Sequence, residues 1–294
     1  MLSCTLFLMA INQILSDLPN HVAGLLYVDD LVVYTSSTYL PATERRLQNA
    51  INKLEKWTGI HGFRFSTRKT VMVHFHRKRS LRREPSVMLY NTQLKCEKNV
   101  KYLGLVFDQR LRWTDHISQL KVRATKALDI LKCVFGTKWE GDRTSLLRLY
   151  RSLIRSKLDY ACFIYWTASE SLLKKLEPVH NAALRIATGA FKTSPLVSLY
   201  ADSGEPPLFF RRKQLALQYY LRVMQEPTSV VGNAILGVDE NTENGTSFGF
   251  KMKSILDGYG YDLSIMEADQ QIDPIWVIPS IVCTNFEPPT KTEK

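Results

Sequence analysis

Two adjacent aspartates, Asp29 and Asp30, lie inside the apolar stretch GLLYVDDLVV (24–33). Like charges in contact repel each other, and burial makes the charged form of each more costly. A divalent cation removes both problems, because Mg²⁺ prefers carboxylate oxygens and binds through one or two of them together with substrate phosphates. The pair therefore fits a metal site that handles a phosphate substrate. A plain hairpin turn that contains aspartate is the simpler alternative.

The residues on either side of the acids predict how they are held. AGLLYV and LVVYT are rich in β-branched and apolar residues, and the acids separate them. This pattern predicts a β-hairpin over residues 23–35 with the acids at its tip. A tight turn would point the carboxylates at a groove with little freedom to move.

Further elements are expected around the hairpin. Residues 2–15 predict a mostly buried helix, and a second helix begins at Pro41 and ends at Gly59 or Gly62. Leu47, Ala50, Ile51, Leu54 and Trp57 share its apolar face. Three segments predict strands: TVMVHFH (70–76), with Val71, Val73 and Phe75 on one face, SVMLYN (86–91) and VKYLGLVFD (100–108).

The second half of the chain changes character. Amphipathic patterns predict helices over 116–135, 142–160, 170–188 and 208–225. Residues 226–294 lose this periodicity and gain glycine, proline and aspartate, so they predict a tail or linker with short ordered pieces.

Charge and cysteine content narrow the class of protein. Residues 1–224 carry 35 Lys and Arg against 17 Asp and Glu, whereas residues 225–294 carry 4 against 11. A basic body suits a nucleic-acid partner, with a solvated basic surface as the alternative. Five scattered cysteines without CxxC spacing indicate reduced thiols in an intracellular protein, with the choice of nucleus or cytoplasm open. No apolar run approaches the roughly 18 residues of a membrane span.

Several segments resemble, in order, the motifs of a known enzyme family. YVDD (27–30) resembles the catalytic motif C of reverse transcriptases, and LSCTLFLMAIN (2–12) resembles the end of motif B. WTGIHGFRFSTRKTVMVHF (57–75) is similar to motif D, and VKYLGLVFDQRLRW (100–113) to motif E, the primer grip. Residues 176–208 resemble the segment that joins thumb to RNase H. The set resembles non-LTR retrotransposon reverse transcriptases of the jockey type.

The resemblance implies an α+β fold. Residues 1–110 would form part of the palm, an antiparallel sheet with packed helices; residues 111–225 a helical thumb and connection; and residues 226–294 an acidic tail. The implied activity is RNA-directed DNA polymerisation, by two-metal transfer of a nucleotide from a dNTP to a primer 3′-hydroxyl. Its cofactor would be Mg²⁺ or Mn²⁺, and its partners an RNA template, an RNA–DNA duplex and dNTPs, with no membrane.

The resemblance also gives roles to single residues. Asp29 would be the main metal ligand of the hairpin, and Asp30 would be a secondary ligand or an electrostatic support. Lys69 would stabilise charge at the triphosphate or donate a proton to pyrophosphate, with membership of a plain basic run as the alternative. The residues implied to line the groove or place the primer backbone are Tyr27, Val28, Tyr102, Leu103 and Gly104.

A basic run over residues 63–83 holds eight Lys and Arg and no acid. It would grip the RNA–DNA backbone by counterion release, and a solvated loop is the alternative. The residues concerned are Arg64, Arg68, Arg77, Lys78, Arg79, Arg82 and Arg83. His74 and His76 share a strand face but have no third ligand nearby, so zinc is not expected. Trp57, Trp113, Trp139 and Trp166 are expected in the core.

The metal-binding aspartate of motif A, the fingers, the RNase H domain and the endonuclease are not found in this sequence. We therefore expect the chain to be inactive alone, an unpaired apolar sheet edge beside residues 23–35, and marginal stability of residues 1–110. Two alternatives stay open: a non-catalytic RNA- or DNA-binding relic, and an interaction protein built on the helical half.

Overall fold

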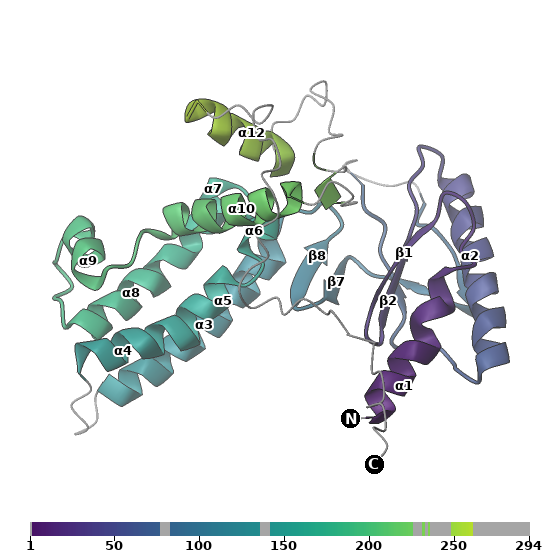
Figure 1. Ribbon diagram of the computed structural model, residues 1–294, viewed down its shortest axis with the longest axis horizontal. Helices are drawn as coiled ribbons and strands as arrows, with labels where there is room; N and C mark the ends of the chain where they lie inside the picture. The colour runs from purple at the N-terminus through teal and green to yellow at the C-terminus, as the bar shows by residue number, and fades with distance from the viewer. Residues whose placement is uncertain are drawn as a thin grey trace, which may run out of the picture. The chain divides into compact units, whose positions relative to one another are not determined.

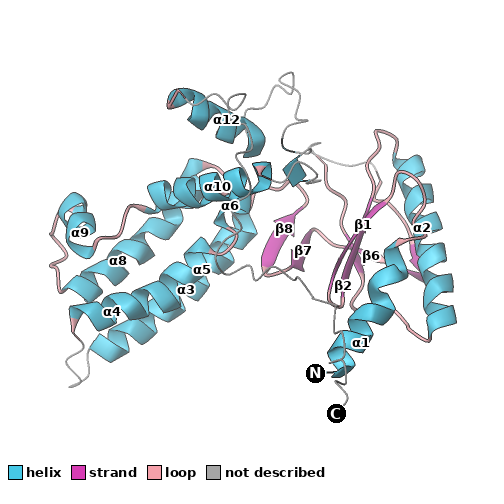
Figure 2. Ribbon diagram, in the orientation of Figure 1, coloured by secondary structure: helices cyan, strands magenta, loops and turns pink. Residues whose placement is uncertain are grey.

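The computed structural model describes residues 2–76, 83–135, 142–225, 231–232, 235 and 248–260. The chain divides into two compact units, residues 1–215 and 216–294. The first unit combines helices with short strands, so the α+β class is confirmed (Figures 1 and 2). No helix in the described part of the chain is long and apolar enough to span a membrane.

The chain begins with helix α1 (Leu2–Ile11), which tightens into the 3-10 turn η1 (Asn12–Leu15). The prediction of a mostly buried helix was wrong. Among the residues of this segment whose side chains are described, only Ile11 and Ile14 are buried, whereas Met9 is 69% exposed. The apolar residues of α1 are spread around its whole circumference, and the described residues cover only one side of it.

Strands β1 (Ala23–Tyr27) and β2 (Asp30–Tyr34) form an antiparallel hairpin, which confirms the predicted element. Side chains along a strand point alternately to its two faces, and Leu26 points inward, against the hydrophobic cluster that contains Ile14 and Trp57. Tyr27 and Leu25 face outward, and each is more than half exposed. Within the described residues β1 and β2 pair only with each other, so the expected unpaired edge is present.

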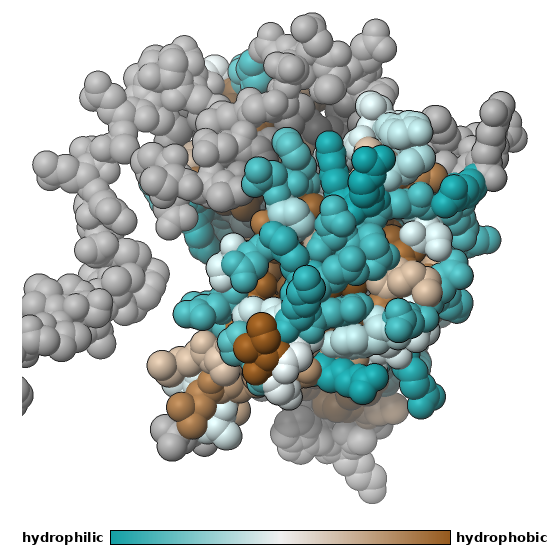
Figure 3. Space-filling view, turned by 90° about the vertical axis from the view of Figure 1, so that its right-hand side faces the viewer, coloured by the Kyte–Doolittle hydropathy of each residue, from teal (hydrophilic) through white to brown (hydrophobic). Residues whose placement is uncertain are grey.

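Helix α2 (Leu40–His61) confirms the second predicted helix. Pro41 lies in its first turn, and Gly62 ends it in the left-handed conformation with φ of 73°. Ala50, Leu54 and Trp57 are buried on the predicted apolar face. On the side of the unit that carries α2, the described residues form a mainly hydrophilic surface (Figure 3). This agrees with a helix that has one apolar and one polar face.

The remaining strands are short, and they do not form the single antiparallel sheet that was expected. Among the described residues they make three separate two-stranded pairs, one of them parallel. TVMVHFH contributes only β3, and Met72 rather than Val71 is its buried residue. VKYLGLVFD is a hairpin and not one strand, because the chain reverses at Leu103 and Gly104. The pairs are β3 (Val71–Met72) with β6 (Lys95–Cys96), β4 (Met88–Leu89) with β5 (Thr92–Gln93), and β7 (Asn99–Tyr102) with β8 (Leu105–Asp108).

A layer of packed helices follows, and it confirms the predicted helical character of this region. Helix α3 (Thr114–Phe135) buries Ile117, Leu120 and Leu131 along one face. It packs against α4 and α8. The helices and turns of this layer are α4 (Arg143–Tyr150), η2 (Arg151–Arg155), α5 (Ser156–Asp159), α6 (Cys162–Tyr165), α7 (Glu170–Leu173), η3 (Lys174–Leu176), α8 (Glu177–Thr188) and α9 (Leu196–Ser203).

A buried ionic cluster joins these helices. Glu205 is 2% exposed and accepts hydrogen bonds at 2.6 Å from both Arg151 and Arg155, which lie on the π-helical turn η2. Asp159 accepts from Arg155 and from Arg211. Charge-assisted hydrogen bonds from two guanidinium groups compensate the desolvation of the glutamate.

Helix α10 (Leu208–Met224) matches the last predicted helix, and the boundary between the two units falls within it. In the second unit the ring of Tyr219 meets that of Phe248 at 6.0 Å. Phe248 begins α12 (Phe248–Gly258), an ordered piece of the segment that was predicted to be a tail or linker. Of the four tryptophans expected in the core, Trp57, Trp113 and Trp166 are buried, and Trp139 lies outside the described residues.

Candidate active site at two hairpin tips

The β1–β2 hairpin holds the two aspartates in the tightest reversal a hairpin allows. Tyr27 pairs with Asp30, so Val28 and Asp29 alone form the loop. Val28 has φ of 57°, as the first central residue of a type II′ turn requires. A β-branched residue in this conformation is a true outlier, where glycine would be relaxed. The strain is concentrated beside the carboxylates, where functional sites commonly hold it.

The tip is open to solvent. Asp29 and Asp30 are exposed, and Tyr27 and Val28 beside them are 60% and 48% exposed. At the opposite end of the hairpin, the hydroxyl of Thr35 donates a 2.6 Å hydrogen bond to the carbonyl of His21. The hairpin is thus anchored at its base and offers both carboxylates at its tip, as predicted.

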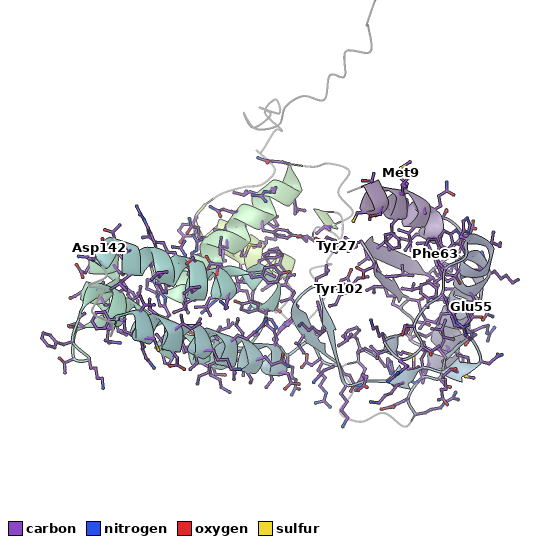
Figure 4. The ribbon with its side chains drawn as sticks, turned by 90° about the horizontal axis from the view of Figure 1, so that it is seen from below. Met9, Tyr27, Glu55, Phe63, Tyr102 and Asp142 are labelled. Atoms are coloured by element: carbon purple, nitrogen blue, oxygen red, sulfur yellow. The ribbon has the colours of Figure 1, made fainter. Side chains whose placement is uncertain are left out.

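The second hairpin, β7–β8, brings Tyr102 to the same region. Its loop is Leu103–Gly104, with φ of 44° and 81°, the two positive values of a type I′ turn. Burial raises the pKa of Tyr102, and the negative charge of Asp30 raises it further. The structure therefore brings together the sequence-predicted residues Asp30 and Tyr102, and Figure 4 shows Tyr27 and Tyr102 at the facing parts of the two hairpins.

Gly104, which the resemblance places at the primer backbone because a glycine would allow close approach of a phosphate chain, is instead covered by a side chain. A side chain built on Gly104 would meet the ring of Tyr160 at 3.2 Å. The phenol of Tyr160 donates a 2.7 Å hydrogen bond to the carbonyl of Leu103. The missing side chain at Gly104 thus makes room for Tyr160, a residue that sequence reasoning did not single out. A tyrosine after a helix carries no signal that would have identified it.

The basic residues of the 63–83 run divide into three groups. Lys69 and Arg68 are exposed in a turn closed by the hydrogen bond from the Lys69 N–H to the Ser66 carbonyl. Arg64 stacks over the ring of Tyr90, 5.1 Å from its centroid, and Arg83 pairs with Glu44 at 3.0 Å. Four of the candidates, Arg77, Lys78, Arg79 and Arg82, lie outside the described residues.

The two carboxylates suit a divalent ion in kind, because hard cations prefer oxygen ligands. Among the described residues no group of three or more His, Cys, Asp and Glu side chains is arranged to hold a metal ion. The rings of His74 and His76 lie 5.5 Å apart without forming such a group. Asp29 and Asp30 thus fit part of a metal site.

Comparison with known proteins identifies a family match for part of the chain. Residues 1–107 match the family described as "Reverse transcriptase (RNA-dependent DNA polymerase)", and this range contains both hairpin tips. No solved structure gives a significant match.

Curated relatives come from insect mobile elements. The putative 115 kDa protein in type-1 retrotransposable element R1DM of Drosophila melanogaster is 24% identical over 67% of this chain and 19% of its own length. The RNA-directed DNA polymerase from mobile element jockey of Drosophila funebris is 23% identical over 73% of this chain and 24% of its own. The probable RNA-directed DNA polymerase from transposon X-element of Drosophila melanogaster is 22% identical over 55% of this chain and 18% of its own length.

This chain therefore spans about a quarter or less of the length of each of these relatives. The match to the family covers both hairpin tips, and the similarity to the relatives extends over half to three quarters of the chain. Residues 1–107 match the reverse transcriptase family, and the chain is similar to proteins of the R1, jockey and X-element mobile elements, two of which are named as RNA-directed DNA polymerases.

Proposed function

We propose that this chain supplies the carboxylate hairpin and the primer-positioning hairpin of an RNA-directed DNA polymerase. The observation that carries the proposal is a pair of exposed carboxylates, one in a strained two-residue turn and one directly after it, within residues that match the reverse transcriptase family. The reaction joins a dNTP to a primer 3′-hydroxyl opposite an RNA template. Residues 1–110 would serve as part of a palm, and residues 111–225 as thumb and connection.

Asp29 and Asp30 would hold divalent ions at the reacting phosphate. Bound ions of this kind, Mg²⁺ or Mn²⁺, activate the attacking hydroxyl and neutralise charge on the leaving pyrophosphate. Asp29 is the stronger candidate, because it lies in the loop itself, whereas Asp30 is already the first residue of β2. Asp30 lies on the strand and close to Tyr102, and this position suits it to a supporting electrostatic role.

The second hairpin would place the primer end against these carboxylates. Tyr102 lies close to Asp30, and the loop at Leu103 is fixed by its hydrogen bond from Tyr160. Tyr27 and Val28 would line the groove on the other side. Lys69, which is exposed, would stabilise charge on the triphosphate.

The basic run would hold the backbone of the RNA–DNA duplex. Arg68 is exposed, and Arg64 is exposed while its guanidinium stacks on Tyr90, so both can reach phosphates. The same role is proposed for Arg77, Lys78, Arg79 and Arg82. Arg83 would have to exchange its pair with Glu44 for a phosphate.

Two carboxylates on one turn do not suffice for two metal ions about 4 Å apart with open coordination positions. We therefore propose that a further carboxylate comes from outside these 294 residues, and that this chain alone does not extend a primer.

The test compares the 294-residue chain with the longest polypeptide encoded by transcripts that contain it. Mg²⁺-dependent extension of a primed RNA is expected from the longer polypeptide only. Asp29→Asn should lower that extension by at least about a hundredfold. The matched control is Asp17→Asn, an exposed aspartate outside both hairpins, which should leave it unchanged.

Three results would contradict parts of the proposal. Extension by the chain alone, lost in Asp29→Asn, would show that its own residues complete the site. Extension by the longer polypeptide that survives Asp29→Asn would remove the assigned role of the hairpin. Salt-dependent duplex binding without extension in either form would favour the non-catalytic relic.

A further inference from the structure

A cavity of about 240 Å³ lies in the helical layer, beside the β7–β8 hairpin. Its wall on α3 consists of residues spaced i, i+4 and i+7, which share one helix face. Its opposite wall comes from α5 and the residue that follows it. The lining residues are His116, Leu120, Arg123, Ser156, Lys157 and Tyr160.

The charge of this cavity is one-sided. Arg123 and Lys157 are cations, Ser156 and Tyr160 carry hydroxyls, and none of the described lining residues is acidic. Arg123 is exposed, so its guanidinium is available to a ligand from solvent. Elsewhere in the same layer, Arg151 and Arg155 are neutralised by Glu205. A pocket with this lining suits an anion with several acceptor oxygens.

His116 forms part of the cavity wall. It is 2% exposed, and its Nδ1 accepts the backbone N–H of Val106 at 3.3 Å. The proton of the neutral ring is then on Nε2, which has no hydrogen-bond partner among the described residues. Because Nε2 is itself buried, the ring of His116 shapes the cavity wall, and the cationic side chains carry the binding.

Two wall residues also touch the second hairpin. His116 receives the Val106 N–H from β8, and Tyr160 donates to the Leu103 carbonyl at the hairpin tip. The cavity is therefore built onto the same hairpin that is proposed to place the primer end. A strand bound at the tip would have its backbone next to the cavity.

We propose that this cavity binds a phosphodiester group of the RNA–DNA duplex, held by Arg123 and Lys157. The inference rests on the proposed function, since it takes the primer strand to lie at the β7–β8 tip. Backbone phosphate is favoured over a free nucleotide, because the triphosphate belongs at the carboxylate hairpin and the body of the chain is strongly basic. Phosphate contacts of this kind position a strand without reading its sequence.

The test measures binding of a fluorescent RNA–DNA hybrid to the full 294-residue chain across a range of salt concentrations. The variant R123Q/K157Q should reduce the slope of log Kd against log salt by about 1, and raise Kd about tenfold at 0.1 M salt. The variant R123K/K157R keeps both charges and should retain most of the slope. The control K121Q/R148Q removes two exposed cations of the same layer that do not line the cavity, and should leave the slope within a few tenths.

If R123Q/K157Q and K121Q/R148Q lower the salt slope and the affinity equally, the cavity residues act only as ordinary surface charges, and the inference is overturned. An unchanged slope in R123Q/K157Q would do the same. If a dNTP competes with the hybrid for the wild-type chain but not for R123Q/K157Q, the ligand is a nucleotide instead. These outcomes are independent of the Asp29 test, because duplex binding needs no catalysis. If Asp29→Asn abolishes extension while R123Q/K157Q leaves duplex binding unchanged, the proposed function stands and only the cavity inference fails.

Discussion

The phenol of Tyr160 donates a 2.7 Å hydrogen bond to the backbone carbonyl of Leu103, and its ring covers Gly104. The contact joins the helical layer to the tip of the β7–β8 hairpin, across 57 positions of sequence. Both loop residues have positive φ, a conformation that leucine adopts only at a cost. The geometry of this tip therefore depends on a residue outside the hairpin.

Tyr160→Phe removes only the hydroxyl of this contact. Because the side chain is 56% exposed, the Leu103 carbonyl can turn to water, and we expect a loss of stability of about 0.5–1 kcal/mol. Hydrogen exchange at the Leu105 and Val106 amides should quicken more than elsewhere in the first unit. Tyr39→Phe, at an exposed tyrosine on a different element, is the control and should change neither quantity. Faster exchange across the whole unit would show that the effect is not local to the tip.

Gly104→Ala should destabilise the protein, whereas Gly59→Ala should stabilise it. At Gly104 φ is 81°, and the new Cβ would lie 3.2 Å from the Tyr160 ring, so a loss of about 1–2 kcal/mol is expected. Gly59 lies within α2 with nothing within 4 Å of an added Cβ. Gly59→Ala should therefore raise stability by about 0.5–1 kcal/mol. Urea denaturation of both variants measures the contrast, and effects of equal sign would contradict the described tip.

Glu205→Ala tests the ionic cluster of the helical layer. It leaves Arg151 and Arg155 without their buried partner, and the expected loss is about 3 kcal/mol. Asp129→Ala removes an exposed carboxylate that pairs with Lys132 at 2.8 Å, and should cost below about 1 kcal/mol. Thermal unfolding of the two variants provides the comparison. A similar, small decrease of the unfolding temperature in both variants would mean that Glu205 is already accessible to water.

Local patterns were sufficient to predict the elements with clear periodicity. The apolar face of α2, its stop at Gly62 and the hairpin around Asp29 and Asp30 all follow from short-range rules, and the structure has them. The helical character of the second half followed in the same way, although the π-helical form of η2 and the helix α9 were not foreseen. These features depend on neighbours within a few residues, which a single sequence displays.

The features that failed depend on partners distant in sequence. VKYLGLVFD is apolar enough for one strand, and only the φ values at Leu103 and Gly104 reveal the turn. Composition predicted a buried α1, yet burial depends on what covers it, and Met9 is largely exposed. Tyr160 could not be foreseen at all, because its role comes from the tertiary contact with Leu103.

Two buried histidines predict how stability changes with pH. Burial lowers the pKa of His116 to about 4, with a smaller effect from Arg123. Burial also lowers the pKa of His180 to about 4, with smaller effects from Arg155 and Arg212. An unfolded histidine titrates near pH 6.5, so between about pH 6.5 and 4 the unfolded chain binds protons that the folded chain does not. These histidines therefore contribute full stability above pH 6.5, and that stability falls as the pH drops towards 4.

The expected slope is about 1.4 kcal/mol per pH unit for each histidine, and urea unfolding between pH 7 and pH 4.5 measures it. His180→Gln keeps a polar group next to the Tyr150 hydroxyl, which lies 2.6 Å from His180 Nδ1, and removes one titration. The variant should be less stable at pH 7, with a curve shallower by about 1.4 kcal/mol per unit. His21→Asn, at an exposed residue with φ of 67° that asparagine tolerates, should leave the slope unchanged. Parallel curves for the wild type and His180→Gln would show that His180 is already protonated in the folded chain, or that water reaches it.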